Sequence, residues 1–334
     1  MTLFEYVWLD GNRPQGIRSK IKVIEDWNGD LDTLPVWNFD GSSTNQAPGS
    51  DSELSLVPVG SYRFKNKILV LCEVFNSDGK PHESNTRYLL RSLVSTSSDL
   101  DTWWGFEQEY FITKDSVPIG FSSEGIQAPQ GQYYCGVGGS KAIGRDLAEY
   151  HILNCLSSKL KISGMNAEVA PSQWEYQCFS DSPLKAADDL IVSRYILLAV
   201  SEEAQLDINF EPKPIKGDWN GSGCHTNFSS EKMRDRGGEA HFKKILSSLE
   251  RRHSEYISEY GESNQERLTG EHETQHYDSF SWGVADRGAS IRIPNVVVKN
   301  NWKGYLEDRR PAANCDPYTV IRLILEALYE VEQN

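Results

Sequence analysis

The segment TWWGFEQEYFIT, residues 102–113, constrains the fold more than any other stretch of the chain. Aromatic and β-branched side chains are typical of strands, and successive side chains of a strand point to opposite faces of a sheet. This period of two places Glu107 and Glu109 on one face and the aromatic Phe106 and Tyr110 on the other. Two carboxylates on a solvent-facing side would mean little, whereas on a buried face they must coordinate cations, because unpaired buried carboxylates are very costly.

A second pair of carboxylates lies in NAEVAPSQWEYQCF, residues 166–179. A Pro-Ser pair separates two short strand-like runs, which places Glu168 and Glu175 on neighbouring segments. An exposed hairpin would also explain this pattern. The aromatic neighbours Trp174 and Tyr176 nevertheless favour an interior position for Glu175.

Histidine and arginine residues stand among glycines in the second half of the chain. In KGDWNGSGCHTNFS, residues 216–229, three glycines precede His225, which suits close approach of the backbone to a ligand and a neutral imidazole that binds metal. A lone histidine is more often structural, so His225 gains weight only from its neighbourhood. Further downstream, guanidinium groups suited to bidentate recognition of phosphate and carboxylate stand beside two more glutamates, namely Arg267, Glu273, Arg287, Arg292, Glu307 and Arg309.

Together these residues indicate phosphate chemistry with metals. Five of these glutamates, one histidine and several arginines fit two or more hard divalent cations that hold a polyphosphate. Zinc is less favoured, because oxygen ligands dominate. The chain has no G-x-x-x-x-G-K-[ST] motif, and the glycine-rich residues 136–146 favour a packing turn rather than a phosphate loop.

Composition excludes several other classes of protein. The 334 residues carry a formal charge of −14, which argues against a binder of nucleic acid. Six dispersed cysteines without a C-x-x-C pair predict a reduced, cytoplasmic chain. A secretion signal is not expected, because the first residues lack a basic region followed by an apolar run. A membrane span is not expected either, because no stretch approaches eighteen consecutive apolar residues.

The pattern of elements predicts an α+β fold. Residues 3–9 and 67–75 are expected to be strands around a loop-rich segment at 37–53, and a polar stretch with Gly79 and Pro81 marks a domain boundary. We therefore expect a small N-terminal domain over residues 1–80 and a larger one over 81–334, with helices backing a mostly antiparallel sheet. The helical patterns cover residues 142–163, 183–206, 238–260 and 317–331.

Eight motifs, in order along the chain, resemble glutamine synthetase of the type found in eukaryotes. They are W-N-F-D-G-S-S-T at 37–44, E-Q-E-Y at 107–110, N-A-E-V at 166–169, Q-W-E-Y-Q at 173–177, G-C-H-T-N-F-S at 223–229, R-L-T-G-x-H-E-T at 267–274, A-S-I-R-I-P at 289–294 and E-D-R-R-P-x-A-N-C-D-P at 307–317. The resemblance implies a β-grasp N-terminal domain, a catalytic C-terminal domain, and a homo-oligomer, a decamer of two pentameric rings. It also implies active sites between adjacent subunits, glutamate, ammonium and ATP as substrates, and two or three Mg²⁺ or Mn²⁺ ions per site.

The same resemblance assigns roles to individual residues. It implies one metal site of Glu109, Glu168 and Glu175, and another of Glu107, His225 and Glu307. Glutamate would bind Arg267, Arg309 and the backbone from Asn220 through Gly221 to Gly223, and the transferred phosphate would bind Arg287 and Arg292. Trp103 and Ser229 would line the nucleotide pocket. Asp40, from the adjacent subunit, would capture ammonium, and Glu273 would lie in a flap that shields the activated intermediate from water.

One departure from the family and two alternative functions remain open. Asp286 stands where the family usually has asparagine, so its carboxylate would weaken phosphate binding or form a local salt bridge. A γ-glutamyl ligase for another amine would need the same metals and arginines. A non-catalytic relative that keeps only the ring is the alternative from a different class.

Overall fold

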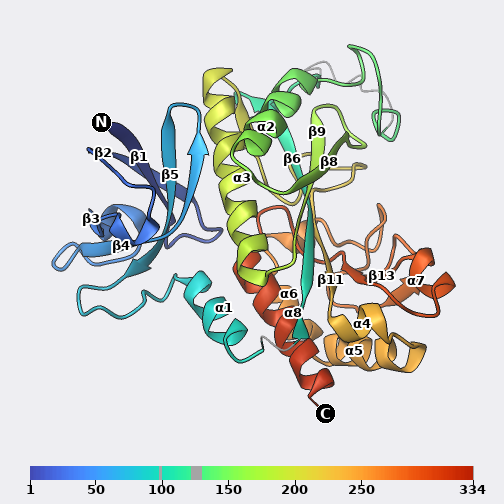
Figure 1. Cartoon of the computed structure of the whole chain (residues 1–334). Coiled ribbons are helices and arrows are strands. Elements are labelled where there is room, and N and C mark those ends of the chain that lie inside the picture. Colours follow the sequence, from blue (N-terminus) through green and yellow to red (C-terminus); the bar gives the residue numbers. More distant parts are fainter. Residues whose placement is uncertain (98–99, 122–129, 334) are drawn as a thin grey trace.

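The computed structural model describes residues 1–97, 100–121 and 130–333. The first part of the chain forms a five-stranded sheet beside the rest of the molecule (Figure 1). Strand β1 pairs in parallel with β5, and the remaining pairs of this sheet are antiparallel. In spatial order the strands are β2 (Ile17–Ile24), β1 (Thr2–Leu9), β5 (Lys67–Phe75), β4 (Glu53–Phe64) and β3 (Trp37–Asp40).

A second, nine-stranded sheet organises the rest of the chain. Its pairs are antiparallel except β12 with β13, as expected for a mostly antiparallel sheet. The main path runs β12 (Trp282–Val284), β13 (Ile291–Ile293), β14 (Leu306–Asp308), β11 (Cys224–Ser229), β6 (Trp103–Lys114), β9 (Gln173–Ser180) and β8 (Ile162–Ala167), while β7 (Val117–Pro118) and β10 (Asp207–Asn209) also pair with β6. The mixture of helices with two sheets confirms the predicted α+β class.

Helices surround this second sheet. Two of them, α3 (Pro183–Glu203) and α8 (Pro317–Glu332), begin with proline after a side-chain cap, Ser182 and Asp316 respectively. This start signal explains why both were predicted within a few residues. The other helices are α1 (Thr86–Val94), α2 (Arg145–Ser157), α4 (Glu231–Asp235), α5 (Glu239–Arg251), α6 (His253–Glu259) and α7 (Asn295–Lys299).

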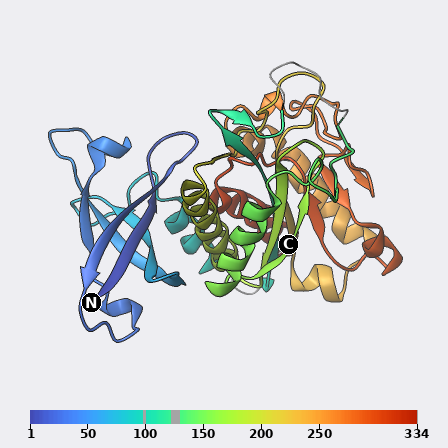
Figure 2. The same cartoon turned by 90° about the horizontal axis from the view of Figure 1, so that it is seen from above.

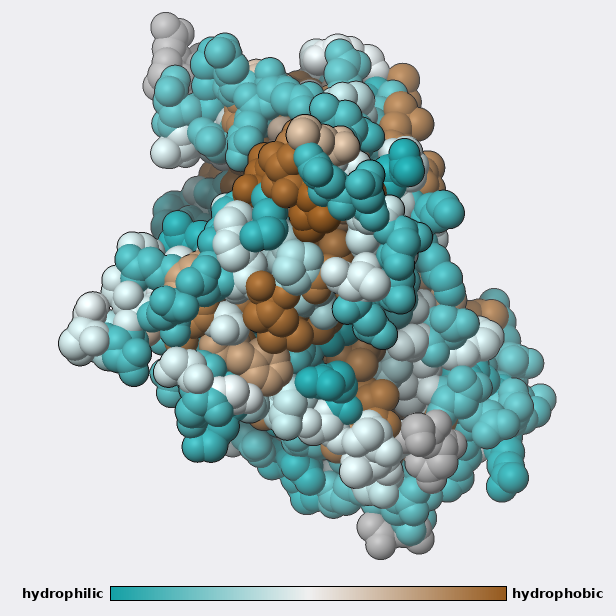
Figure 3. All heavy atoms as spheres, turned by 60° about the vertical axis from the view of Figure 1, so that its left-hand side comes forward, coloured by the Kyte–Doolittle hydropathy of each residue, from teal (hydrophilic) through white to brown (hydrophobic). Residues whose placement is uncertain are grey.

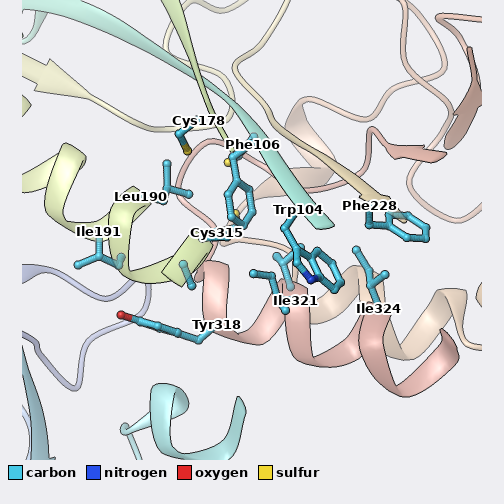
Figure 4. Close-up of a cluster of buried hydrophobic side chains, with 14 of the residues drawn as sticks. Trp104, Phe106, Cys178, Leu190, Ile191, Phe228, Cys315, Tyr318, Ile321 and Ile324 are labelled. Carbon is cyan, nitrogen blue, oxygen red and sulfur yellow. The ribbon is translucent and has the colours of Figure 1, made fainter. Parts of the chain in front are cut away.

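The main hydrophobic core lies between the second sheet and the two helices α3 and α8. Trp104 and Phe106 of β6 point toward Leu190 of α3 and Ile321 of α8 (Figure 4). These four side chains are completely or almost completely buried. The period of two predicted for β6 is therefore correct, because Trp104, Phe106 and Tyr110 enter the core and leave Glu107 and Glu109 on the opposite face.

Three predicted segments differ from the structure. The helix expected over 142–163 ends at Ser157, because Lys159 has φ +62°, a left-handed conformation that terminates helices, and the chain then enters β8. The helix expected over 238–260 is two helices, since Arg252, with φ −100° and ψ 5°, leaves helical geometry. The loop-rich segment at 37–53 contains β3, whose backbone pairs with β4.

The surface on the side of the first sheet is mainly hydrophilic, but hydrophobic patches cross the middle of this face (Figure 3). Apolar side chains exposed on the edge strand β2 include Ile21 and Val23, which are 49% and 57% exposed. Within the described residues, no helix is both long and apolar enough to cross a bilayer.

Candidate active site

Carboxylates from three adjacent strands converge on the face of the second sheet that lies away from α3. Glu109 of β6 stands directly opposite Glu175 of β9, and Glu175 in turn faces Asn166 of β8. Glu168 follows β8 immediately, and its backbone N–H donates to the carbonyl of Gln173. One oxygen each of Glu109, Glu168 and Glu175 lies within 4.8 Å of the others, so the structure brings together the first predicted metal site.

Burial and mutual repulsion raise the pKa of each of these three side chains. All three are at most 9% exposed. Burial raises the pKa of Glu109 to about 7 and, together with the nearby Glu109 charge, raises the pKa of Glu168 to about 8. Burial also raises the pKa of Glu175, and the neighbouring Glu107 adds to the shift. A bound divalent cation would oppose both effects, because its positive charge stabilises the ionised carboxylates.

His225 joins a second group of ligands. Its Nδ1 lies 3.6 Å from Glu107 Oε2 and 3.6 Å from Glu307 Oε1. Burial, followed by the charge of Arg309, holds the pKa of His225 well below its ordinary value, so the imidazole is neutral, as a metal ligand must be.

The carboxylate of Glu307 contacts arginines in addition to the predicted ligand His225. It forms ion pairs with Arg292 Nε at 2.6 Å and with Arg309 Nη1 at 2.8 Å. Atoms of Glu107, Glu175 and His225, rather than Glu307, lie within 4.8 Å of one another. The predicted set of Glu107, His225 and Glu307 is therefore contiguous, but Glu175 lies at the junction of both groups and Glu307 faces the arginines.

A glycine loop and a buried arginine lie beside Glu109. The backbone N–H of Gly223 donates to Glu109 Oε2 at 2.9 Å. A Cβ on Gly223 would lie 3.0 Å from both Arg267 Nη1 and His225 Nε2, so a larger residue would displace one of them. Arg267 is 5% exposed, its Nη2 donates to the carbonyl of Arg310 at 2.7 Å, and burial lowers its pKa to about 10.

The other predicted glutamate-binding residues lie around this loop. Gly221 packs against Arg267, since a Cβ there would lie 2.5 Å from Arg267 Cγ. Asn220 is held by two hydrogen bonds with Gln130, both of 2.8 Å. Arg309 Nε donates to the carbonyl of Arg287 at 3.1 Å, which ties this side chain to the next segment.

The segment predicted as a flap carries Glu273 in a left-handed conformation. His272 and Glu273 have φ of +52° and +62°, which is strained for residues other than glycine, asparagine and aspartate. Glu273 Oε2 pairs with Arg287 Nη2 at 2.9 Å, and both side chains are about half exposed. Two predicted catalytic groups therefore meet in an accessible position.

A pocket of about 330 Å³ lies next to the carboxylates. Trp103 and Ser229, which are register partners on β6 and β11, line it together with Glu107 and Gln177. The Arg234 guanidinium lies 4.1 Å from the centre of the Trp103 ring. An aromatic wall that opens onto acidic ligands suits a base whose phosphates extend toward cations.

Asp40 is the one predicted site residue that lies far from this cluster. It ends β3 at the outer edge of the first sheet, across the molecule from β6 and β11 (Figures 1 and 2). Its exposed carboxylate accepts hydrogen bonds from the hydroxyl and backbone N–H of Ser42, which lower its pKa. Within one chain, Asp40 does not reach the site.

Asp286 makes a local hydrogen bond rather than the salt bridge that was one of the two outcomes expected for it. Its Oδ1 accepts a hydrogen bond of 2.9 Å from the backbone N–H of Gly288. Within the described part of the chain, no lysine, arginine or histidine forms an ion pair with it. The carboxylate therefore stabilises the turn that carries Arg287.

Comparisons with known proteins agree with this geometry. A family model described as "Glutamine synthetase, catalytic domain" matches residues 83–247. A glutamine synthetase of Emericella nidulans is 49% identical over 97% of this chain and 91% of its own length. The chain belongs to the glutamine synthetase family. Members from Yarrowia lipolytica and Saccharomyces cerevisiae are each 48% identical, over 98% and 97% of this chain and 90% and 88% of their own lengths.

The sequence analysis missed the side-chain amides that contact the clustered carboxylates of this member of the glutamine synthetase family. Gln173 Nε2 lies 3.2 Å from Glu109 Oε2, and Asn227 Nδ2 lies 2.8 Å from Glu107 Oε1. A signal did exist, because residues two apart on a strand share a face. The amides that stand two positions from a cluster glutamate are Asn166, Gln173 and Gln177.

Proposed function

We infer that this chain catalyses the ATP-dependent joining of ammonia to glutamate, giving glutamine, ADP and phosphate. The observation that carries this inference is the convergence of two overlapping groups of metal-ligand type, joined at Glu175, beside the buried Arg267. Membership of the glutamine synthetase family supports the same reaction.

Divalent cations fit the donor set of this site. Three buried carboxylates lie within 4.8 Å of one another, and among the described residues none of them forms an ion pair with lysine or arginine. Such oxygen ligands suit Mg²⁺ or Mn²⁺, and we propose two or three ions per site held by Glu109, Glu168, Glu175, Glu107, His225 and Glu307. Bound cations would neutralise the phosphates of ATP and the charge that develops during transfer.

The protein's own groups orient the two substrates. We propose that Arg267, Arg309 and the backbone from Asn220 to Gly221 bind glutamate, and that the pocket at Trp103 and Ser229 takes the adenine. The γ-carboxylate oxygen of glutamate then attacks the terminal phosphorus of ATP, the bond to the bridging oxygen breaks, and ADP leaves. Arg287 and Arg292 are the groups proposed to stabilise the transferred phosphoryl group.

The second step forms the amide. Ammonia attacks the acyl carbon of γ-glutamyl phosphate, phosphate leaves with the bonding electron pair, and one proton is lost from nitrogen. We propose that Asp40 of an adjacent subunit binds ammonium and takes a proton, and that Glu273 shields the acyl phosphate from water. The exposed position of Glu273 beside Arg287 is consistent with a segment that closes over substrate.

An oligomer with shared sites follows from the position of Asp40. One chain lacks Asp40 at its own carboxylate cluster, so we propose a homo-oligomer, a decamer of two pentameric rings, in which a second copy supplies it. The apolar side chains exposed on β2 support association. We also propose that residues 1–80 form a β-grasp domain and 81–334 the catalytic domain, and that the protein is cytoplasmic, because all six cysteines carry free thiols.

Mixing two inactive variants tests whether sites are shared. Asp40→Asn and Glu273→Gln subunits are each expected to have little activity alone. If each site takes these groups from different chains, unfolding and refolding an equimolar mixture should restore about one quarter of wild-type activity, since about one site in four receives both native groups. Recovery no greater than the sum of the separate variants would contradict shared sites.

Phosphate release with different amines tests the reaction itself. We expect release to require ATP, glutamate, a divalent cation and ammonium together, with bulkier amines such as ethanolamine or a polyamine far less effective. Formation of glutamine, followed by chromatography, is the matching product assay. Equal turnover with ammonium and larger amines would favour the broader γ-glutamyl ligase, and no release under any condition would favour the non-catalytic relative.

A further inference from the structure

Gln177 and Asn166 form a chain of hydrogen bonds between two of the clustered carboxylates, Glu175 and Glu168. Its Nε2 donates to Glu175 Oε1 at 2.5 Å and to Asn166 Oδ1 at 2.7 Å. The Asn166 amide then donates to Glu168 Oε1 at 2.9 Å. Two carboxamides, with Gln177 hydrogen-bonded to the other, therefore connect Glu175 of β9 with Glu168, which follows β8.

The backbone is shaped to admit this carboxamide. The pairing of β8 with β9 shifts between Ile162 and Gly164, and the shift places Gly164 opposite Gln177. A Cβ on Gly164 would lie 2.7 Å from Gln177 Oε1, closer than such atoms approach. Glycine at this position thus leaves room for the amide, and the irregular pairing brings it there.

The chemistry of an amide suits this place. A lysine or arginine would also hold the carboxylates, but it would neutralise the negative charge that attracts cations. A carboxamide donates hydrogen bonds and stays neutral at every pH of interest. It therefore orients Glu175 and Glu168 without lowering their affinity for a metal.

Gln177 also lies in the wall of the pocket that holds Trp103 and Ser229. It stands directly opposite Glu107 in the pairing of β9 with β6. A ligand in the pocket would lie beside the side chain that orients Glu175. Gln177 therefore borders both parts of the site.

We propose that Gln177 is a positioning residue that fixes Glu175 and, through Asn166, Glu168 for cation binding, and that couples filling of the adjacent pocket to that binding. This inference rests on the function proposed above. It adds an uncharged side chain that links the proposed nucleotide pocket to the metal ligands Glu175 and Glu168.

Calorimetric titration of the full-length protein with Mn²⁺, without substrates, tests the first part. Gln177→Leu and Gln177→Met both remove the amide donor without adding a charge or a carboxylate ligand. Both should weaken Mn²⁺ binding by roughly 10- to 100-fold, the usual cost of losing a group that orients a metal ligand. Wild-type affinity in folded Gln177→Leu protein would overturn the proposal.

Gly164→Ala provides an independent test from the opposite strand. The added methyl group would push against the Gln177 amide, so binding should weaken in the same direction while Gln177 itself is intact. If alanine acts through the amide, the double variant Gly164→Ala/Gln177→Leu should bind no more weakly than Gln177→Leu alone. Additive losses would show that the strand pairing, rather than Gln177, was damaged, and would overturn the proposal.

Adenosine tests the coupling, because it fills the pocket without phosphates that chelate Mn²⁺. The affinity of wild-type protein for Mn²⁺ should change when adenosine is saturating, and this change should vanish in Gln177→Leu. A merely structural role would leave it intact. Wild-type protein that neither binds Mn²⁺ nor makes glutamine would instead refute the proposed function, whereas an active wild type with unaltered variants refutes only the role of Gln177.

Discussion

Glu175→Gln is expected to stabilise the metal-free protein while it removes most of the activity. Glu175 belongs to both groups of ligands and is 8% exposed. Without a cation, its carboxylate is buried beside Glu107, Glu109 and Glu168, which raise its pKa in addition to burial. Glutamine keeps the shape and removes this repulsion, but it is a much weaker ligand. We expect activity to fall by at least about 100-fold, the upper end of what loss of an orienting partner costs.

The gain in stability from Glu175→Gln should increase as the pH rises. The pKa values of Glu109 and Glu168 rise from 4.5 to about 7 and about 8 on folding, so the folded metal-free protein binds protons that the unfolded chain releases. Stability therefore declines as pH increases from about 4.5 to 8. The melting temperature of Glu175→Gln should exceed that of wild type by about 2 °C or more above pH 8, equivalent to about 1 kcal/mol, and match it near pH 5.

Scanning calorimetry with and without Mn²⁺ measures both effects. Mn²⁺ should raise the melting temperature of wild-type protein more at pH 8 than at pH 5.5, because the cation competes with protons, and it should do little for Glu175→Gln. Glu250→Gln, an exposed replacement on α5, is the matched control and should alter neither stability nor activity. A metal-free Glu175→Gln protein that melts below wild type at pH 8 would contradict the repulsion described here.

The parts of this site that follow local rules were predictable from the sequence. The period of two along β6 and β9 placed Glu107, Glu109 and Glu175 on one face, and the turn at Pro171 brought Glu168 beside them. These positions depend only on strand geometry and burial. The caps and prolines at the starts of α3 and α8 were equally local signals.

Other features depend on contacts between distant segments and could not be predicted. Arg292, which pairs with Glu307, comes from β13, so this contact depends on how β13 and β14 assemble. The break between α5 and α6 is another case. It occurs next to His253, whose ring contacts the backbone carbonyl of Tyr277 and the guanidinium of Arg310, and both residues are far along the chain.

The buried pair of Asp308 and Arg310 was also missed, since the sequence analysis considered only Glu307 and Arg309 in the same motif. Strand alternation in β14 turns Asp308 to the core, where it is fully buried, and Arg310 is 1% exposed. Arg310 donates to both oxygens of Asp308, from Nε at 2.9 Å and Nη2 at 2.6 Å. Tyr260 adds a hydrogen bond of 3.1 Å to the same carboxylate.

Breaking this pair should cost more stability than any surface change. Asp308→Leu leaves the Arg310 charge buried without its partner, and Arg310→Met does the same to Asp308. We expect each single variant to lose about 3–5 kcal/mol of unfolding free energy, as measured by urea denaturation. The double variant Asp308→Leu/Arg310→Met should recover much of this loss, because no charge remains unpaired in the core. Single losses below about 1 kcal/mol, or a double variant that loses the sum of both, would contradict the view that each charge stabilises the fold only through the other.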